Sequence, residues 1–212
     1  MPQPELDRLI EVMHTLRRDC PWDAEQTHRS LVGYLVEESL EVVEAIEDGA
    51  DPALAEELGD LLLQVVFHSE IAAEEGRFDI ADVARGITDK LITRHPYVFA
   101  AAPVPDDLLA SWEQRKRAEK GRSSVLDGIP TRMSALSRAS KVIARSDWHE
   151  DLPATDAVPA ADGPGDIGRR ILALVAEAHA NGVDPEQATR AAVRDLERRI
   201  AAAEADRVTE TT

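Results

Sequence analysis

Four acidic residues are spaced so that they could act together. Glu38 and Glu41 are three positions apart, and so are Glu57 and Asp60. Residues three positions apart lie on one face of a helix, so each pair would present two carboxylates side by side. The surrounding segment, residues 31–76, contains thirteen Asp and Glu and no Lys or Arg. Since repulsion among these charges is costly without screening, the segment is either a strongly hydrated surface or a cation site.

An all-oxygen cluster of this kind suits a hard metal ion. Mg²⁺ prefers near-octahedral oxygen ligands and leaves room for water and substrate phosphates. We therefore expect Glu38, Glu41, Glu57 and Asp60 to bind Mg²⁺, with Mn²⁺ able to replace it. The alternative is a solvated helical face, which is the usual meaning of an isolated Glu-x-x-Glu pattern. The presence of two such pairs on neighbouring predicted helices favours the metal site.

The helices that would bring these pairs together can be predicted from Pro and Gly positions. One helix is expected from about Leu31 to Asp48, ended by Gly49, and the next from near Pro52 to Gly76. The short turn between them predicts an antiparallel pair. Gly59 costs about 1 kcal/mol relative to Ala inside a helix, so close helix packing is expected there. Eight apolar residues are expected to bury the pair: Val42, Ile46, Leu54, Leu58, Leu61, Leu62, Val65 and Val66.

Two further helices complete a predicted four-helix bundle over residues 1–100. Apolar residues between Leu6 and Leu16 recur at helical spacing, and the pattern stops at the CPWD turn that begins at Cys20. Asp79 is expected to cap the other helix, which stops at His95 before a proline. The low aromatic content, 4%, also favours an all-α fold over a sheet.

The rest of the chain predicts connecting helices, a linker and a weak repeat. Residues 101–148 hold charged helices around 112–120 and 132–145, and residues 149–165, rich in Pro and Gly, are expected to form a flexible linker. Residues 166–212 align with the second acidic helix when Gly168 is set on Gly59, but Arg169 then replaces Asp60. We interpret this segment as a degenerate half-repeat without metal ligands; the alternative is a chance match between Ala- and Leu-rich helices.

Charge and cysteine content limit the classes of function. A net charge of −17 disfavours nonspecific binding to nucleic acid or an anionic membrane, and it leaves small ligands as the expected partners. Cys20 is the only cysteine, which excludes an internal disulfide. The N-terminus lacks a signal-peptide pattern and no apolar run is long enough to span a membrane, so a cytoplasmic protein is expected.

Several segments together resemble the MazG family of all-α nucleoside triphosphate pyrophosphohydrolases, whose motif is ExxE followed, after a spacer, by ExxD. EESLE at 37–41 and EELGDLLLQVVFHSEIA at 56–72 match this motif, with the four predicted ligands in the motif positions. The resemblance covers most of residues 5–148, through CPWDAEQTHRSL, GRFDIADV, KLITRHPYVF and VLDGIP. It implies a Mg²⁺-dependent enzyme that hydrolyses NTPs or dNTPs, noncanonical ones included, to the monophosphate and pyrophosphate. It also implies a role in clearing nucleotide pools.

Other candidate site residues have competing interpretations. Glu37, with Glu44 as the alternative, could act as general base, although a solvent-facing role is equally compatible with the sequence. Lys90 and Arg94 could bind phosphates, but cations are also expected at a helix C-terminus because of its dipole. Trp22 could stack on a base, whereas core or lid packing is the commoner role for such a tryptophan.

The remaining expectations concern histidines and assembly. His28 is expected to serve in a turn, while His14 and His68 lack ligand spacing and are expected on the surface or in packing roles. A small four-helix unit with apolar residues on several faces would expose a large patch, so a homodimer is expected, as the resemblance also implies. The competing function is a catalytically silent helical regulator or partner-binding module. A di-metal oxidase is disfavoured because its second Glu-x-x-His pair is missing.

Overall fold

A computed structural model describes residues 4–49, 51–121, 123–146 and 166–210. Throughout these ranges the regular structure is helical and no strand occurs, which confirms the all-α prediction. The chain divides into two compact units, residues 1–104 and residues 105–212, and each is described by itself. In the described ranges no helix is both long enough and apolar enough to cross a membrane.

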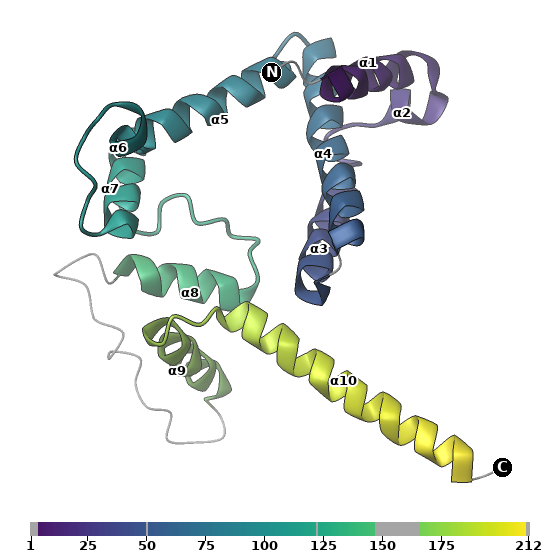
Figure 1. Cartoon of the computed structure of the whole chain (residues 1–212), viewed down its shortest axis with the longest axis vertical. Coiled ribbons are helices and arrows are strands. Elements are labelled where there is room, and N and C mark those ends of the chain that lie inside the picture. The colour runs from purple at the N-terminus through teal and green to yellow at the C-terminus, as the bar shows by residue number, and fades with distance from the viewer. Residues whose placement is uncertain (1–3, 50, 122, 147–165, 211–212) are drawn as a thin grey trace. The chain divides into compact units, whose positions relative to one another are not determined.

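The first unit is organised around one long helix, α4 (Asp51–Glu74), which packs against α1, α3 and α5. Figure 1 shows α3 and α4 side by side as an antiparallel pair. The core cluster of this unit consists of buried side chains from α1, α4 and the start of α3: Met13, Leu31, Val66, Phe67 and Ile71. The other helices are α1 (Pro4–Asp19), α2 (Pro21–Glu25), α3 (Val32–Asp48), α5 (Ile80–Arg94) and α6 (Pro96–Phe99).

Two predicted helix boundaries are confirmed with the expected chemistry. Gly49 ends α3 in the left-handed conformation, with φ of 69°, which glycine adopts without a Cβ penalty. Asp79 caps α5 by accepting a hydrogen bond from the backbone N–H of Asp82, while the Asp82 side chain accepts from the backbone N–H of Asp79. This reciprocal capping box satisfies two N–H groups that the helix itself leaves unpaired.

The predicted burial of the α3–α4 pair is only partly correct. Val42 and Val66 are buried, but four of the eight apolar residues are exposed in the single chain: Ile46 (56%), Leu58 (48%), Leu62 (40%) and Val65 (38%). The expected close packing at Gly59 is also wrong within one chain, because a Cβ built there meets no atom within 4 Å outside its own helix backbone. The reason is that each helix of the pair has apolar residues on more faces than its neighbours cover.

The second unit contains α7 (Leu108–Lys120), α8 (Ala135–Ser146), α9 (Ile167–Ala180) and α10 (Pro185–Glu210). Helix α8, which the sequence placed in the connecting region, packs against both α9 and α10. Its buried Arg145 donates two hydrogen bonds of 2.9 Å to the backbone carbonyls of Val125 and Asp127, which ties the preceding loop to the helix. The predicted linker, residues 149–165, lies outside the described residues.

Candidate metal centre

Three of the four predicted ligands lie together on the α3–α4 pair. Glu38 and Glu41 extend from α3 and Glu57 from α4, and each offers a carboxylate oxygen within 4.8 Å of the other two. Glu38 and Glu57 are half-buried, whereas Glu41 is exposed. Asp60 lies one turn after Glu57 and is not part of this compact group, although its charge acts on both Glu38 and Glu57.

The electrostatics of the group favour a cation. Partial burial raises the pKa of Glu38 above its ordinary value, and the carboxylates of Asp60 and Glu41 raise it further. Desolvation also raises the pKa of Glu57, followed by the charges of Glu41 and Glu56. The largest charge effects on these two residues come from other acidic groups. A divalent cation would replace this mutual repulsion by attraction.

The distances between the carboxylate oxygens are also close to those expected around a hard divalent ion. Two oxygens bound at about 2.1 Å to one Mg²⁺ are at most about 4.2 Å apart, when they lie on opposite sides of the ion. The observed spread of up to 4.8 Å among Glu38, Glu41 and Glu57 therefore requires only a small contraction. The ligand atoms are carboxylate oxygens throughout, which suits Mg²⁺ or Mn²⁺ better than soft metals.

The two candidate general bases lie near different ligands: Glu37 lies near Glu38, and Glu44 lies near Glu57. Glu37 is exposed, and its charge acts on the neighbouring Glu38. Glu44 is also exposed, and its charge acts on Glu57 across the helix pair. Both carboxylates are therefore close enough for their charges to influence the centre.

An aromatic pair lies beside the helix that carries Glu38. Trp22 is 51% exposed, which disagrees with the core packing that is commoner for such a residue. Its ring meets Tyr34 edge to face, with centroids 6.1 Å apart and an interplanar angle of 84°. Tyr34 is four residues before Glu38 and therefore shares its face of α3. Tyr34 was not among the residues predicted from sequence, although this spacing was a usable signal.

Lys90 and Arg94 lie in the last two turns of α5. Lys90 is exposed, whereas Arg94 is buried, at 8% exposure. Neither residue is among the groups whose charges act on Glu38 or Glu57.

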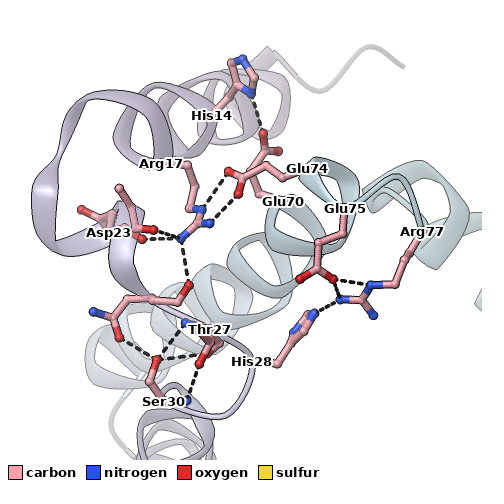
Figure 2. Close-up of polar contacts among 12 residues, drawn as sticks. His14, Arg17, Asp23, Thr27, His28, Ser30, Glu70, Glu74, Glu75 and Arg77 are labelled. Carbon is pink, nitrogen blue, oxygen red and sulfur yellow. Dashed lines mark hydrogen bonds and ion pairs between the residues drawn. The ribbon is translucent and has the colours of Figure 1, made fainter.

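A second polar network holds α1 and the CPWD turn against α4. The Arg17 guanidinium donates to both carboxylate oxygens of Glu74, and to the backbone carbonyls of Asp23, Ala24 and Gln26. Figure 2 shows this arginine at the meeting point of α1, the turn and α4. Its side chain is only 7% exposed. This role could not be predicted from local sequence patterns, because the carboxylate partner is 57 positions away.

Residues 166–210, for which we predicted a degenerate repeat, contain no comparable group of carboxylates among the residues that the structure describes. Asp166 and Arg169, which align with the ExxD pair, form an ion pair of 3.1 Å with each other. The arginine neutralises the carboxylate that remains, so a cation gains little from this position.

Comparison of the sequence with known proteins identifies the family to which the chain belongs. A model of the MazG nucleotide pyrophosphohydrolase domain matches residues 26–99, which include α3, α4 and all four predicted ligands. A Thermotoga maritima protein named nucleoside triphosphate pyrophosphohydrolase/pyrophosphatase MazG is 37% identical over 214 residues, covering 92% of this chain and 83% of that protein.

Two further relatives extend the likeness. An Escherichia coli protein named nucleoside triphosphate pyrophosphohydrolase is 45% identical over 167 residues, and the match covers 73% of this chain but only 64% of the relative. An uncharacterised 26.1 kDa protein of Streptomyces cacaoi is 44% identical over 210 residues, covering 96% of this chain and 84% of that protein. With the paired acidic helices in place, the chain belongs to the MazG family of nucleotide pyrophosphohydrolases.

Proposed function

We propose that this chain hydrolyses nucleoside or deoxynucleoside triphosphates, noncanonical ones included, to the monophosphate and pyrophosphate. The observation that carries the proposal is the group of Glu38, Glu41 and Glu57, in which neighbouring carboxylates raise the pKa of Glu38 and of Glu57. The names of the Thermotoga maritima and Escherichia coli relatives support the same reaction class. Clearance of unwanted nucleotides is the corresponding cellular role.

Each residue then has a defined task. Glu38, Glu41, Glu57 and Asp60 would hold Mg²⁺, or Mn²⁺ in its place. The bound ion supplies charge neutralisation of the phosphates and activation of the attacking water. Glu37 would accept the proton from that water, because its exposed carboxylate neighbours Glu38.

The substrate contacts are proposed from chemistry and position. Trp22 and Tyr34 would bind the base by stacking, since both rings are exposed and lie near the Glu38 face of α3. Lys90 and Arg94 would bind phosphate oxygens by charge-assisted hydrogen bonds.

A substrate panel tests the reaction. Purified protein should release pyrophosphate, and no orthophosphate, from at least one NTP or dNTP in the presence of Mg²⁺, and removal of divalent ions with a chelator should stop the reaction. Separate assays for pyrophosphate and orthophosphate make the measurement. Release of orthophosphate from the γ-position would place the cleaved bond elsewhere, and inactivity across the panel would favour a silent regulator.

We further propose that two chains pair through the exposed apolar face of α3 and α4. Ile46, Leu58, Leu62 and Val65 are between 38% and 56% exposed, and such a patch is normally covered. Gly59 lies on the same helix between Leu58 and Leu62, and a Cβ added to it would meet nothing within 4 Å. An approaching helix could therefore come unusually close at this glycine, and isologous pairing is the commonest way to bury a patch of this kind.

Replacing Gly59 by Ala distinguishes the paired form from the monomer. If a second chain packs on Gly59, Gly59→Ala should weaken the dimer at least about tenfold, because the added methyl group prevents close approach. In a monomer the same change should instead raise stability by up to about 1 kcal/mol through helix propensity. Light scattering and sedimentation across a concentration series measure the dimer, and Gly33→Ala, at a helical glycine that is equally open, is the control.

A further inference from the structure

Two histidine rings from distant parts of the sequence meet between the loop before α3 and the middle of α4. The rings of His28 and His68 have centroids 5.0 Å apart and an interplanar angle of 12°. Their Nδ1 atoms are 2.8 Å apart, which is hydrogen-bond distance. On the other side of His28, Arg77 contacts its Nε2, as Figure 2 shows.

These contacts assign the protons of both rings. Arginine has only N–H donors, so His28 Nε2 must be the acceptor and its proton must be on Nδ1. His28 Nδ1–H then donates to His68 Nδ1, which places the His68 proton on Nε2. The His68 Nε2 atom is buried without a partner among the described residues, and so is Gln64 Oε1 one turn earlier. With this assignment His68 Nε2 is a hydrogen-bond donor and Gln64 Oε1 is an acceptor. With the opposite tautomer of His68, both atoms would be acceptors.

The loop that carries His28 is itself held in one conformation. The backbone N–H of Thr27 donates to Ser30 Oγ at 2.9 Å, and the backbone N–H of Ser30 donates to Thr27 Oγ1 at 3.1 Å. The Ser30 hydroxyl also donates to Gln26 Oε1 at 2.8 Å. This loop leads directly into α3, so the histidine contact fixes how the N-terminal end of α3 lies on α4.

We propose that His28 and His68 form an acid-sensitive clamp, which holds the start of α3 on α4 only while the His68 ring is neutral. A proton added to His68 converts its Nδ1 acceptor into a donor that faces the Nδ1–H of His28. This removes the hydrogen bond between the two rings and sets two donors against each other, so the clamp opens in acid.

The charges around the clamp do not reverse this conclusion. Burial, followed by the neighbouring His28, lowers the pKa of His68 below its ordinary value of 6.5, and no carboxylate is among the causes. Other charged groups on the adjoining elements form ion pairs with each other. These pairs are Glu75 with Arg77 after α4, Asp82 with Arg85 on α5, and His14 with Glu70 and Arg17 with Glu74 between α1 and α4. A cleft of about 460 Å³ beside His28 is lined by Arg17, Glu25, Arg29, Glu74 and Glu75 among others.

The sign of the pH dependence follows from the lowered pKa. Because the unfolded chain takes up a proton at His68 at a higher pH than the folded chain, the stabilisation is complete above about pH 6.5. It is lost progressively as the pH falls from there through the folded-state pKa. Each proton that the folded state excludes raises the unfolding equilibrium constant by up to about tenfold per pH unit in that window.

Long-range ¹H–¹⁵N spectra of the wild-type protein test the proton assignment directly. At pH 8 His28 should appear as the Nδ1–H tautomer and His68 as the Nε2–H tautomer. As the pH is lowered, His68 should titrate below 6.5. The reversed tautomers, or a His68 ring that is already charged at pH 7, would overturn the clamp without any variant being made.

Denaturant unfolding between pH 8 and pH 5 then tests the consequence. His68→Asn keeps an acceptor, Oδ1, close to the position of Nδ1 but cannot be protonated in this range. It should therefore retain the clamp and show a smaller loss of stability in acid than the wild type. His14→Asn, which removes a histidine paired with Glu70, is the matched control and should show at least the wild-type loss. Equal losses in the wild type and His68→Asn would contradict the proposal. Denaturant unfolding does not depend on catalysis, so failure of this test would not bear on the proposed hydrolysis of nucleoside triphosphates.

Discussion

Glu57→Gln should reduce Mg²⁺-dependent pyrophosphate release at least about a hundredfold while leaving the helices intact. The substitution removes an anionic oxygen from the group that Glu57 forms with Glu38 and Glu41. Several kcal/mol of charge stabilisation in the transition state depend on a correctly held cation, and each 1.36 kcal/mol corresponds to about tenfold in rate. Calorimetric titration with Mg²⁺ should show weakened binding in parallel.

Three matched variants make this result specific. Glu56→Gln removes the same charge one residue earlier, from an exposed position, and should retain most of the activity. Glu37→Gln should lower the rate while leaving Mg²⁺ affinity nearly unchanged, as expected for a base that does not hold the ion. Asp60→Asn should behave like Glu57→Gln if Asp60 joins the ligands when the ion is bound. Full activity of both Glu57→Gln and Asp60→Asn would remove the case for a catalytic metal centre on α3 and α4.

Glu57→Gln should leave the free energy of unfolding of the metal-free protein unchanged or slightly higher at neutral pH. The pKa of Glu57 is raised in the folded chain, so the folded state favours the protonated form relative to the unfolded state. Above that pKa the ionised carboxylate opposes folding, and replacing it by Gln relieves the repulsion. As the pH falls through the folded pKa, the wild-type carboxyl is neutralised and the difference between the two proteins should disappear. Unfolding in a chelating buffer at several pH values measures this.

Arg17→Ala should lower the free energy of unfolding by about 3 kcal/mol. The change leaves a partly buried carboxylate, Glu74, without its partner, and it removes the donor for the backbone carbonyls of Asp23, Ala24 and Gln26. Breaking a well-buried ion pair costs about 3–5 kcal/mol, and the 41% exposure of the Glu74 side chain reduces that cost. The corresponding fall in melting temperature is roughly 6–12 °C for a chain of this size.

The neighbouring arginine provides the control. Arg18 pairs with Asp19 at 2.6 Å, but its side chain is 61% exposed, so Arg18→Ala should leave the free energy of unfolding almost unchanged. Arg17→Lys should lie between the two, since one ammonium cannot replace the forked contact with Glu74. If Arg17→Ala and Arg18→Ala were equally mild, the Arg17 network would not be what holds α1 and the turn on α4.

The local features of this protein could be predicted from sequence because they depend on neighbouring residues. Gly49 ends α3 and Asp79 caps α5 through backbone conformations and hydrogen bonds that span only a few positions. The side-by-side placement of Glu38 and Glu41 follows from helical spacing in the same way. The antiparallel turn then brings Glu57 to them, so the carboxylate group and the family motif could both be recognised without coordinates.

The tertiary structure decided which groups meet across helices. Asp60 lies outside the compact carboxylate group, although its i, i+3 spacing from Glu57 is the same as that between Glu38 and Glu41. Gly59 and Leu58 are uncovered, His28 reaches His68 40 positions away, and Arg17 reaches Glu74 57 positions away. Sequence periodicity gives the face of a helix on which a residue lies. Which partner it meets depends on how far each helix is rotated and where the helices cross, and packing of the whole unit sets both.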